Sequence, residues 1–213
     1  SKIILENFRC FKSRQEIELK PLTFLVGENS TGKTSFLAAI RLATGILSPK
    51  RPPMNVLDFN TEPFILGAYE QIASYASGRK GRAKSFLIGY ETTQRAYSDK
   101  YTVRVTARFV PHQGQPVINE YVLKDIDSGV ERKAEIDLPS GRVMLEDIQI
   151  NGQEIRSDHV VAAPWWLNEF IFDFNRLVDQ KKKIAKPGRH FRRLSEEAFA
   201  IAPVRMRPER TYD

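Results

Sequence analysis

The loop at residues 27–34 constrains this chain more than any other feature, because it matches the pattern G-x-x-x-x-G-K-[ST] in full. Such loops wrap their backbone around nucleotide phosphates. The run before it, residues 22–26, has the apolar, β-branched composition of a buried strand. After it, apolar residues recur at helical spacing and a glycine stands where the helix should end, at Phe36, Leu37, Ile40, Ala43 and Gly45. Strand, loop and helix together predict binding of a nucleoside triphosphate.

Each loop residue has an expected physical role. Gly27 lets the chain leave the strand, and Gly32 lets the backbone come close to the phosphates. Backbone N–H groups of the loop and the positive end of the following helix attract an anion. Lys33 is expected on the β- and γ-phosphates, as the catalytic cation, and Thr34 on Mg²⁺. The predicted nucleotide contacts are Gly27, Asn29, Ser30, Thr31, Gly32, Lys33, Thr34 and Ser35.

Composition limits the class of protein. A length of 213 residues suits one domain, or one domain with an appendage. One cysteine, Cys10, excludes a disulfide framework and fits a reducing compartment, and three scattered histidines give no zinc ligand set. The longest apolar run, near residues 160–167, is too short to cross a bilayer, and the N-terminus is strand-like rather than a leader. The sequence thus predicts a soluble, cytoplasmic protein without membrane contact.

The basic charge is concentrated near the end of the chain. The net charge is +7, and residues 176–210, with 11 Lys or Arg and 4 Asp or Glu, carry all of it. This block predicts contact with DNA or an acidic partner through Lys181, Lys182, Lys183, Arg189, Arg192 and Arg193. A solvated helical face, or a surface covered in a larger assembly, explains the same charges. Phe191 is the one ring among them, so base stacking gains little support.

The periodicity of the chain predicts an α/β fold. Residues 2–7 and 15–19 alternate as half-buried strands do, and residues 48–63, with four prolines, cannot be regular throughout. A short helix is expected within residues 64–77. Further strands are expected at residues 85–91, 101–110, 117–124, 131–138 and 142–150, with a hairpin at Asn151-Gly152. Residues 165–183 show a helical period.

We therefore expect one incomplete nucleotide-binding domain with three parts. Residues 1–47 form the P-loop core with a mixed sheet, residues 64–155 an antiparallel β layer, and residues 160–213 a basic helical end.

The start of the chain resembles a known family. The run Ile4-Leu5-Glu6-Asn7-Phe8-Arg9-Cys10-Phe11, an extended pair and then the glycine loop are similar to the opening of ABC-type ATPases of the RecF, SMC and OLD (overcoming lysogenization defect) kind. Residues 66–70 and 202–210 are reminiscent of bacterial AAA-family members, including some from anti-phage systems. The resemblance implies ATP and Mg²⁺ as ligands and a homo-oligomer or a second ATPase half as partner.

The resemblance also assigns two further residues. Gln71 is a candidate for the Q-loop glutamine that senses the γ-phosphate through the metal, and a surface glutamine is the alternative. Arg9 stands at the family's early basic position, where it touches nucleotide in some members, and a surface arginine at a strand end is the alternative. Cys10 is expected to be a small packed side chain, since no base that could activate it is identifiable.

Other family motifs are not found with their expected flanks. Hydrolysis in that family needs an acidic Walker B strand, a serine-glycine signature and a switch histidine. Two segments could supply the Walker B strand. Residues 170–174 place apolar residues before Asp173 but lack the glutamate that should follow it. Residues 143–147 contain Glu146 and Asp147 but run into a hairpin. Ser77-Gly78 and Ser140-Gly141 are turn-like. The chain looks like the first half of an ATPase that ends before its catalytic half.

Three functions remain open from the sequence. In the first, the complete enzyme hydrolyses ATP at a composite interface and acts on DNA, in repair or in phage defence. In the second, the chain is an interaction module that ATP brings together without turnover. A nucleoside or small-molecule kinase is the third, and the absence of a lid-like arginine set argues against it.

Overall fold

A computed structural model describes residues 1–29, 31–46, 57–75, 81–96, 99–137, 142–150, 153–155 and 159–162. Several predictions lie outside these residues: Ser30, the two serine-glycine pairs, the Asn151-Gly152 turn, the 165–183 helix with Asp173, residues 202–210, and the basic block with Lys181, Lys182, Lys183, Arg189, Arg192 and Arg193.

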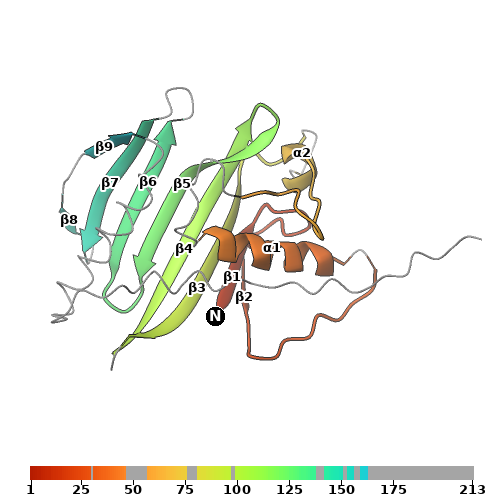
Figure 1. Ribbon diagram of the computed structural model, residues 1–213, viewed down its shortest axis with the longest axis horizontal. Helices are drawn as coiled ribbons and strands as arrows, with labels where there is room; N and C mark the ends of the chain where they lie inside the picture. Colours follow the sequence, from red (N-terminus) through yellow and green to blue (C-terminus); the bar gives the residue numbers. More distant parts are fainter. Residues whose placement is uncertain are drawn as a thin grey trace, which may run out of the picture.

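One nine-stranded sheet dominates the described residues (Figure 1). Its order is β2-β1-β3-β4-β5-β6-β7-β8, and β9 pairs with β7. The strands are β1 (Lys2–Glu6), β2 (Gln15–Glu18), β3 (Phe86–Ala96), β4 (Asp99–His112), β5 (Gln115–Asp125), β6 (Val130–Asp137), β7 (Arg142–Ile150), β8 (Gln153–Ile155) and β9 (His159–Ala162). The strands expected from alternation are thus confirmed, and β7 pairs with β8, the strand that follows residues 151–152.

The expectation of a mixed core sheet beside a separate antiparallel layer is wrong for the described residues. Each strand pair among them is antiparallel, and β1 pairs with β3 as well as β2. Both edges of β1 are therefore occupied, and the P-loop core and the β-rich part share one sheet. The cause is the long-range pairing of Lys2–Glu6 with the residues around Ile88, which periodicity within each segment does not specify.

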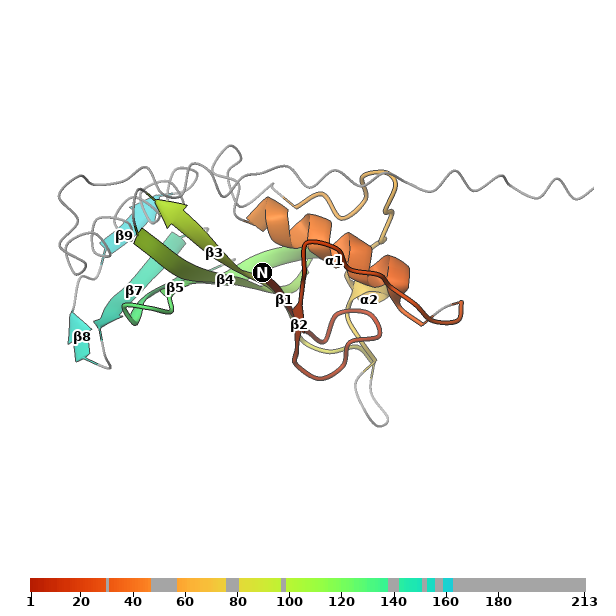
Figure 2. The ribbon, with the colours of Figure 1, turned by 90° about the horizontal axis from the view of Figure 1, so that it is seen from below.

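Helix α1 (Lys33–Ile46) lies across one face of the sheet at the β1–β3–β4 end (Figure 2). Its buried side chains include Phe36 and Leu42 and face the apolar side chains of β1 and β3. An aromatic cluster fills the core beside it, with the rings of Phe86 and Phe109 stacked at 4.9 Å between centroids and Phe59 edge-on to both. This packing holds the start of α1 in a fixed place on the sheet.

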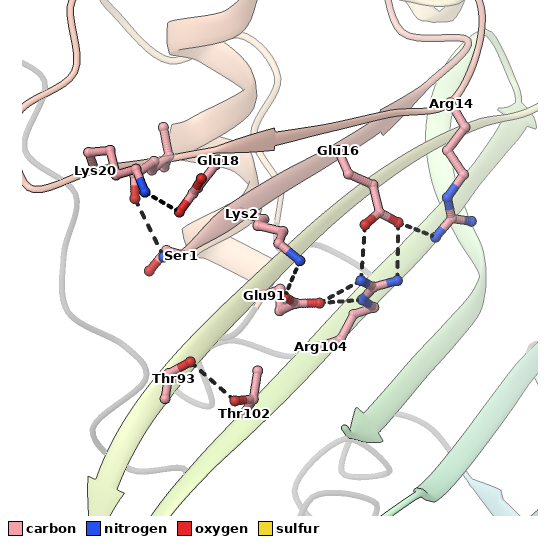
Figure 3. A network of polar contacts seen from close by, with 11 residues as sticks. Ser1, Lys2, Arg14, Glu16, Glu18, Lys20, Glu91, Thr93, Thr102 and Arg104 are labelled. Atoms are coloured by element: carbon pink, nitrogen blue, oxygen red, sulfur yellow. Dashed lines mark hydrogen bonds and ion pairs between the residues drawn. The ribbon is translucent and has the colours of Figure 1, made fainter. Parts of the chain in front are cut away.

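The other face of the sheet carries cross-strand ion pairs (Figure 3). Glu91 of β3 pairs with Lys2 of β1 at 2.9 Å and with Arg104 of β4 at 2.5 Å. Both carboxylate oxygens of Glu16 in β2 accept hydrogen bonds from Arg104 at 3.1 Å. Opposite charges on facing positions thus tie four neighbouring strands together.

The predicted strand at residues 22–26 is not formed. Leu22, Phe24 and Val26 are 72%, 77% and 92% exposed. The segment runs out from β2 in a wide loop and returns to the first turn of α1 (Figure 1). A strand needs a neighbour for its N–H and C=O groups, and no described residue supplies one here.

The two helix predictions that fall within the described residues hold, with one correction. Gly45 does not cap α1, which continues to Ile46. A side chain at Gly45 would meet Leu57 at 2.9 Å, so the glycine serves close packing instead. The short helix expected within residues 64–77 is α2 (Tyr69–Ile72). Neither helix of the described residues has the length and apolar character needed to cross a membrane.

Candidate functional site

The glycine loop leads directly into α1. The first backbone hydrogen bond of the helix runs from the Phe36 N–H to the Gly32 carbonyl, so the N–H groups before it have no partner within the helix. Gly27 has φ +150° and Gly32 has φ +99°, which side chains disfavour. A β-carbon on Gly32 would lie 2.5 Å from Cys10 Sγ. The loop therefore depends on both glycines.

Lys33 folds back over the loop that precedes it. Its ammonium donates hydrogen bonds to the carbonyl oxygens of Gly27 at 2.6 Å and Glu28 at 2.5 Å. The Thr31 hydroxyl donates to the same Glu28 carbonyl at 2.8 Å. The ammonium also lies 3.5 Å from the Thr31 hydroxyl oxygen, so its positive charge is held directly at the loop, where it attracts an anion.

A cavity of about 450 Å³ opens beside the start of α1. The loop and the helix contribute Asn29, Gly32, Lys33, Thr34 and Ser35 to its lining. Other parts of the chain contribute Arg9, Cys10, Gln71, Tyr75 and Arg82. Most predicted site residues thus line one cavity, including Arg9 and Gln71. Gly27 and Thr31 are not part of the lining and shape the loop instead.

Arg9 reaches the cavity from a tight turn after β1. Phe8 and Phe11 exchange backbone hydrogen bonds of 3.1 and 2.8 Å, and Arg9 has φ +51°. Left-handed backbone at a residue other than glycine is uncommon and costs energy, so packing must impose it. The Arg9 N–H donates to the Ile72 carbonyl at 2.7 Å, and its guanidinium to the Leu66 carbonyl at 2.9 Å.

The charge of Arg9 is only partly compensated. Its Nε is buried without a hydrogen-bond partner among the described residues. Burial lowers the pKa of the Arg9 guanidinium, interaction with Cys10 raises it, and Arg82 lowers it again. A guanidinium that is desolvated beside a second one favours an anion between them.

Gln71 lies in α2 and lines the cavity. Its Oε1 accepts a hydrogen bond from the Ala68 N–H at 3.0 Å, which caps the start of the helix. A role in metal binding for Gln71 stays a prediction.

The prediction that Cys10 is a small packed side chain is wrong. Cys10 is exposed and lines the cavity, with its sulfur against Gly32. Cys10 follows Arg9 in the turn that the Phe8–Phe11 backbone hydrogen bonds close, and this turn lies beside the loop. The cysteine's place beside a glycine of the motif depends on tertiary packing.

Tyr75 and Arg82 are site residues that sequence reasoning missed. They face each other in an isolated antiparallel bridge, and the Ala83 N–H donates to the Ser74 carbonyl at 2.8 Å. Ser74 in turn donates its N–H to the Asn7 carbonyl at 2.8 Å. These backbone bonds bring three distant segments to one wall of the cavity. The signal in the sequence was only an aromatic and a basic residue flanking a turn.

The lining has three cationic side chains, Arg9, Lys33 and Arg82, and no acidic side chain among the described residues. Such a cavity attracts a polyanion of several linked negative charges. The free amides at the start of α1 add to this attraction. The volume lies within the usual range for small-ligand sites, which is about 300–1,000 Å³.

These residues fit Mg-ATP. The loop, Lys33 and the Arg9 guanidinium suit the phosphates, and Thr34 is exposed in the lining, where its hydroxyl can reach a metal. Mg²⁺ takes its remaining ligands from phosphates and water, so no cluster of protein carboxylates is needed to hold it.

Comparison with known proteins places the chain in a family. A family model described as an AAA domain matches residues 2–197 of the chain. The OLD nuclease of Thermus scotoductus is 30% identical over 105 residues, which is 42% of this chain and 20% of that relative. The chain spans about a fifth of the length of that relative.

Proposed function

This chain belongs to the AAA-domain ATPases of the RecF, SMC and OLD kind, and on that premise we propose that its cavity binds Mg-ATP as half of a composite ATPase site. One observation carries the proposal: Lys33, Arg9 and Arg82 converge on a single cavity at the start of α1 with no carboxylate among the described lining.

The residues divide the work of holding the phosphates. Lys33 neutralises the β- and γ-phosphates, and the amides around Gly32 bind phosphate oxygens. The Thr34 hydroxyl would hold the metal, and Arg9 adds a second cation. When bound, Mg²⁺ would supply further neutralisation of the phosphate charge. Catalysis in such sites is mostly positioning and electrostatic stabilisation, so these groups prepare the nucleotide for attack.

We propose that the carboxylate needed to orient the attacking water comes from outside the described residues, on a second ATPase half or a second copy. The exposed run of Leu22, Phe24 and Val26 supports this completion, because it lies just before the loop and pairs with no strand of the described residues. An apolar segment this exposed is typical of a surface that pairs with further structure.

A second candidate function is ATP-dependent association without turnover. The lack of a carboxylate among the lining residues that the structure describes favours it. We also propose that the complete protein acts on DNA, in repair or in phage defence. The supports for this are the relative named a nuclease and the predicted contacts of Lys181–Lys183, Arg189, Arg192 and Arg193.

Nucleotide binding and turnover by this chain separate the two functions. We expect Mg-ATP binding with little phosphate release, and no release by Lys33→Ala. Addition of the completing half should raise phosphate release if the site is composite. Robust release by this chain alone would show that a carboxylate is already present and would contradict the composite site.

A further inference from the structure

The nucleoside end of the cavity is not explained by the glycine loop. The loop, Lys33 and Thr34 account for phosphates and metal, whereas a nucleobase is planar and binds through stacking on its faces. Among the described lining residues, Tyr75 contributes the one aromatic ring. Tyr75 and the residue that covers it are therefore the candidates for a base-binding surface.

Arg82 lies on the ring of Tyr75. The central carbon of its guanidinium is 3.6 Å from the ring centroid, which is stacking distance. Arg82 also donates a hydrogen bond to the Ala73 carbonyl at 3.3 Å. The backbone bridge between Tyr75 and Arg82 holds the two side chains on the same side of their short ladder. The pair is thus oriented before any ligand arrives.

The pair is accessible to a ligand. Tyr75 is 63% exposed, and both residues line the cavity that also holds Lys33. An exposed aromatic ring stacked on a guanidinium contributes little to core packing, so its place in a polyanion site favours a role in ligand binding. Neither side chain fills the apolar core described above.

We propose that Tyr75 and Arg82 form the platform on which the nucleobase of the bound triphosphate stacks. The inference rests on the proposed function and adds to it the residues that recognise the nucleoside. Arginine planes and aromatic rings both stack on bases with little base specificity. The platform therefore selects nucleotides over plain polyphosphates rather than one base over another.

The test compares Mg-ATP with inorganic tripolyphosphate plus Mg²⁺, which has the same chain of phosphates and no base. Tyr75→Leu removes the ring and keeps Arg82, while Arg82→Lys keeps the charge and loses the plane. Each change should weaken ATP about tenfold and leave tripolyphosphate within about twofold. Lys84→Ala removes an exposed charge outside the lining, so it should bind both ligands like the wild type.

The outcomes separate the two proposals. If Arg82→Lys and Tyr75→Leu weakened both ligands equally, the pair would contact phosphate, and the platform would be overturned. If neither variant changed ATP affinity while Lys33→Ala abolished it, the platform would fail and the nucleotide site would stand. If the wild type bound neither ligand, the nucleotide site would fail and the platform with it.

Discussion

The sulfur atom of Cys10 lies against Gly32 of the glycine loop, so that a β-carbon on Gly32 would be 2.5 Å from it. The turn after β1 and the loop before α1 are therefore in direct contact. Any group added to either residue changes the cavity that Lys33 and Arg9 share.

Alkylation of Cys10 should block nucleotide binding. It is the one cysteine of the chain and it is exposed, so maleimide reports on this position alone. At ATP about 100 times its Kd, about 1% of the protein is free, and labelling should slow by up to about a hundredfold. Mass spectrometry over time measures this rate. Equal labelling with and without Mg-ATP would place the nucleotide elsewhere.

Gly32→Ala should destabilise the protein more than Gly114→Ala. Both residues have positive φ, +99° and +76°, and each alanine carries about 1–2 kcal/mol of backbone strain. Only Gly32 also has a neighbour in the way, because nothing lies within 4 Å of a β-carbon on Gly114. Urea unfolding measures the difference. Cys10→Ala added to Gly32→Ala should restore the stability lost beyond that of Gly114→Ala. If the double variant were no more stable than Gly32→Ala, the contact between Cys10 and Gly32 would be contradicted.

The ion pairs of Glu91 should make stability fall in acid. Burial raises the pKa of Glu91, but hydrogen bonds from Lys2 and Arg104 outweigh it and hold the pKa below its ordinary value. The contribution of Glu91 is therefore complete above the unfolded pKa near 4.5 and is lost as the pH falls through the lower folded value.

Unfolding of Glu91→Gln at pH 7 and in acid tests this linkage. At pH 7 the change should cost about 1–3 kcal/mol, and the gap to the wild type should narrow in acid. Glu18→Gln, which breaks the exposed pair with Lys20, should have no measurable effect at either pH. If the difference in unfolding free energy between the wild type and Glu91→Gln stayed constant with pH, the lowered pKa of Glu91 would be contradicted.

The exposed run before the loop should tolerate polar substitution. Phe24 is 77% exposed, so Phe24→Ser should change the free energy of unfolding by less than about 0.5 kcal/mol. Phe36 is 4% exposed, so Phe36→Ala should lower the free energy of unfolding by about 3–5 kcal/mol. A loss above about 1 kcal/mol for Phe24→Ser would show that this segment packs in solution. In the proposed composite site, Phe24→Ser should also weaken association with the completing half.

Local patterns predicted much of the fold. Alternation identified the strands because the sheet has one apolar and one charged face, as in β6, where buried and half-buried residues alternate. The loop motif identified the start of α1, because the loop needs a glycine and a lysine at fixed neighbouring positions, Gly32 and Lys33, and the sequence shows both directly. These features depend on residues close together in the chain.

Features that depend on distant segments were missed or misjudged. The run at residues 22–26 has a strand's composition, but strand formation needs a partner, and composition does not report one. The segment that carries Tyr75 is joined to the turn of Arg9 by backbone hydrogen bonds. The Arg9 N–H donates to the Ile72 carbonyl, and the Ser74 N–H donates to the Asn7 carbonyl. No local period encodes those pairings, so the second wall of the cavity is visible only in the fold.

Equilibrium binding of Mg-ATP to the wild type and to Lys33→Ala tests the central claim most directly. Lys12→Ala is the matched control, because Lys12 is exposed near the same turn and does not line the cavity. Calorimetry should show binding by the wild type and Lys12→Ala, and at least a tenfold loss for Lys33→Ala, since a charge-assisted contact is worth about 1.5–3 kcal/mol. Equal affinity of Lys33→Ala and the wild type would contradict a nucleotide site at the start of α1.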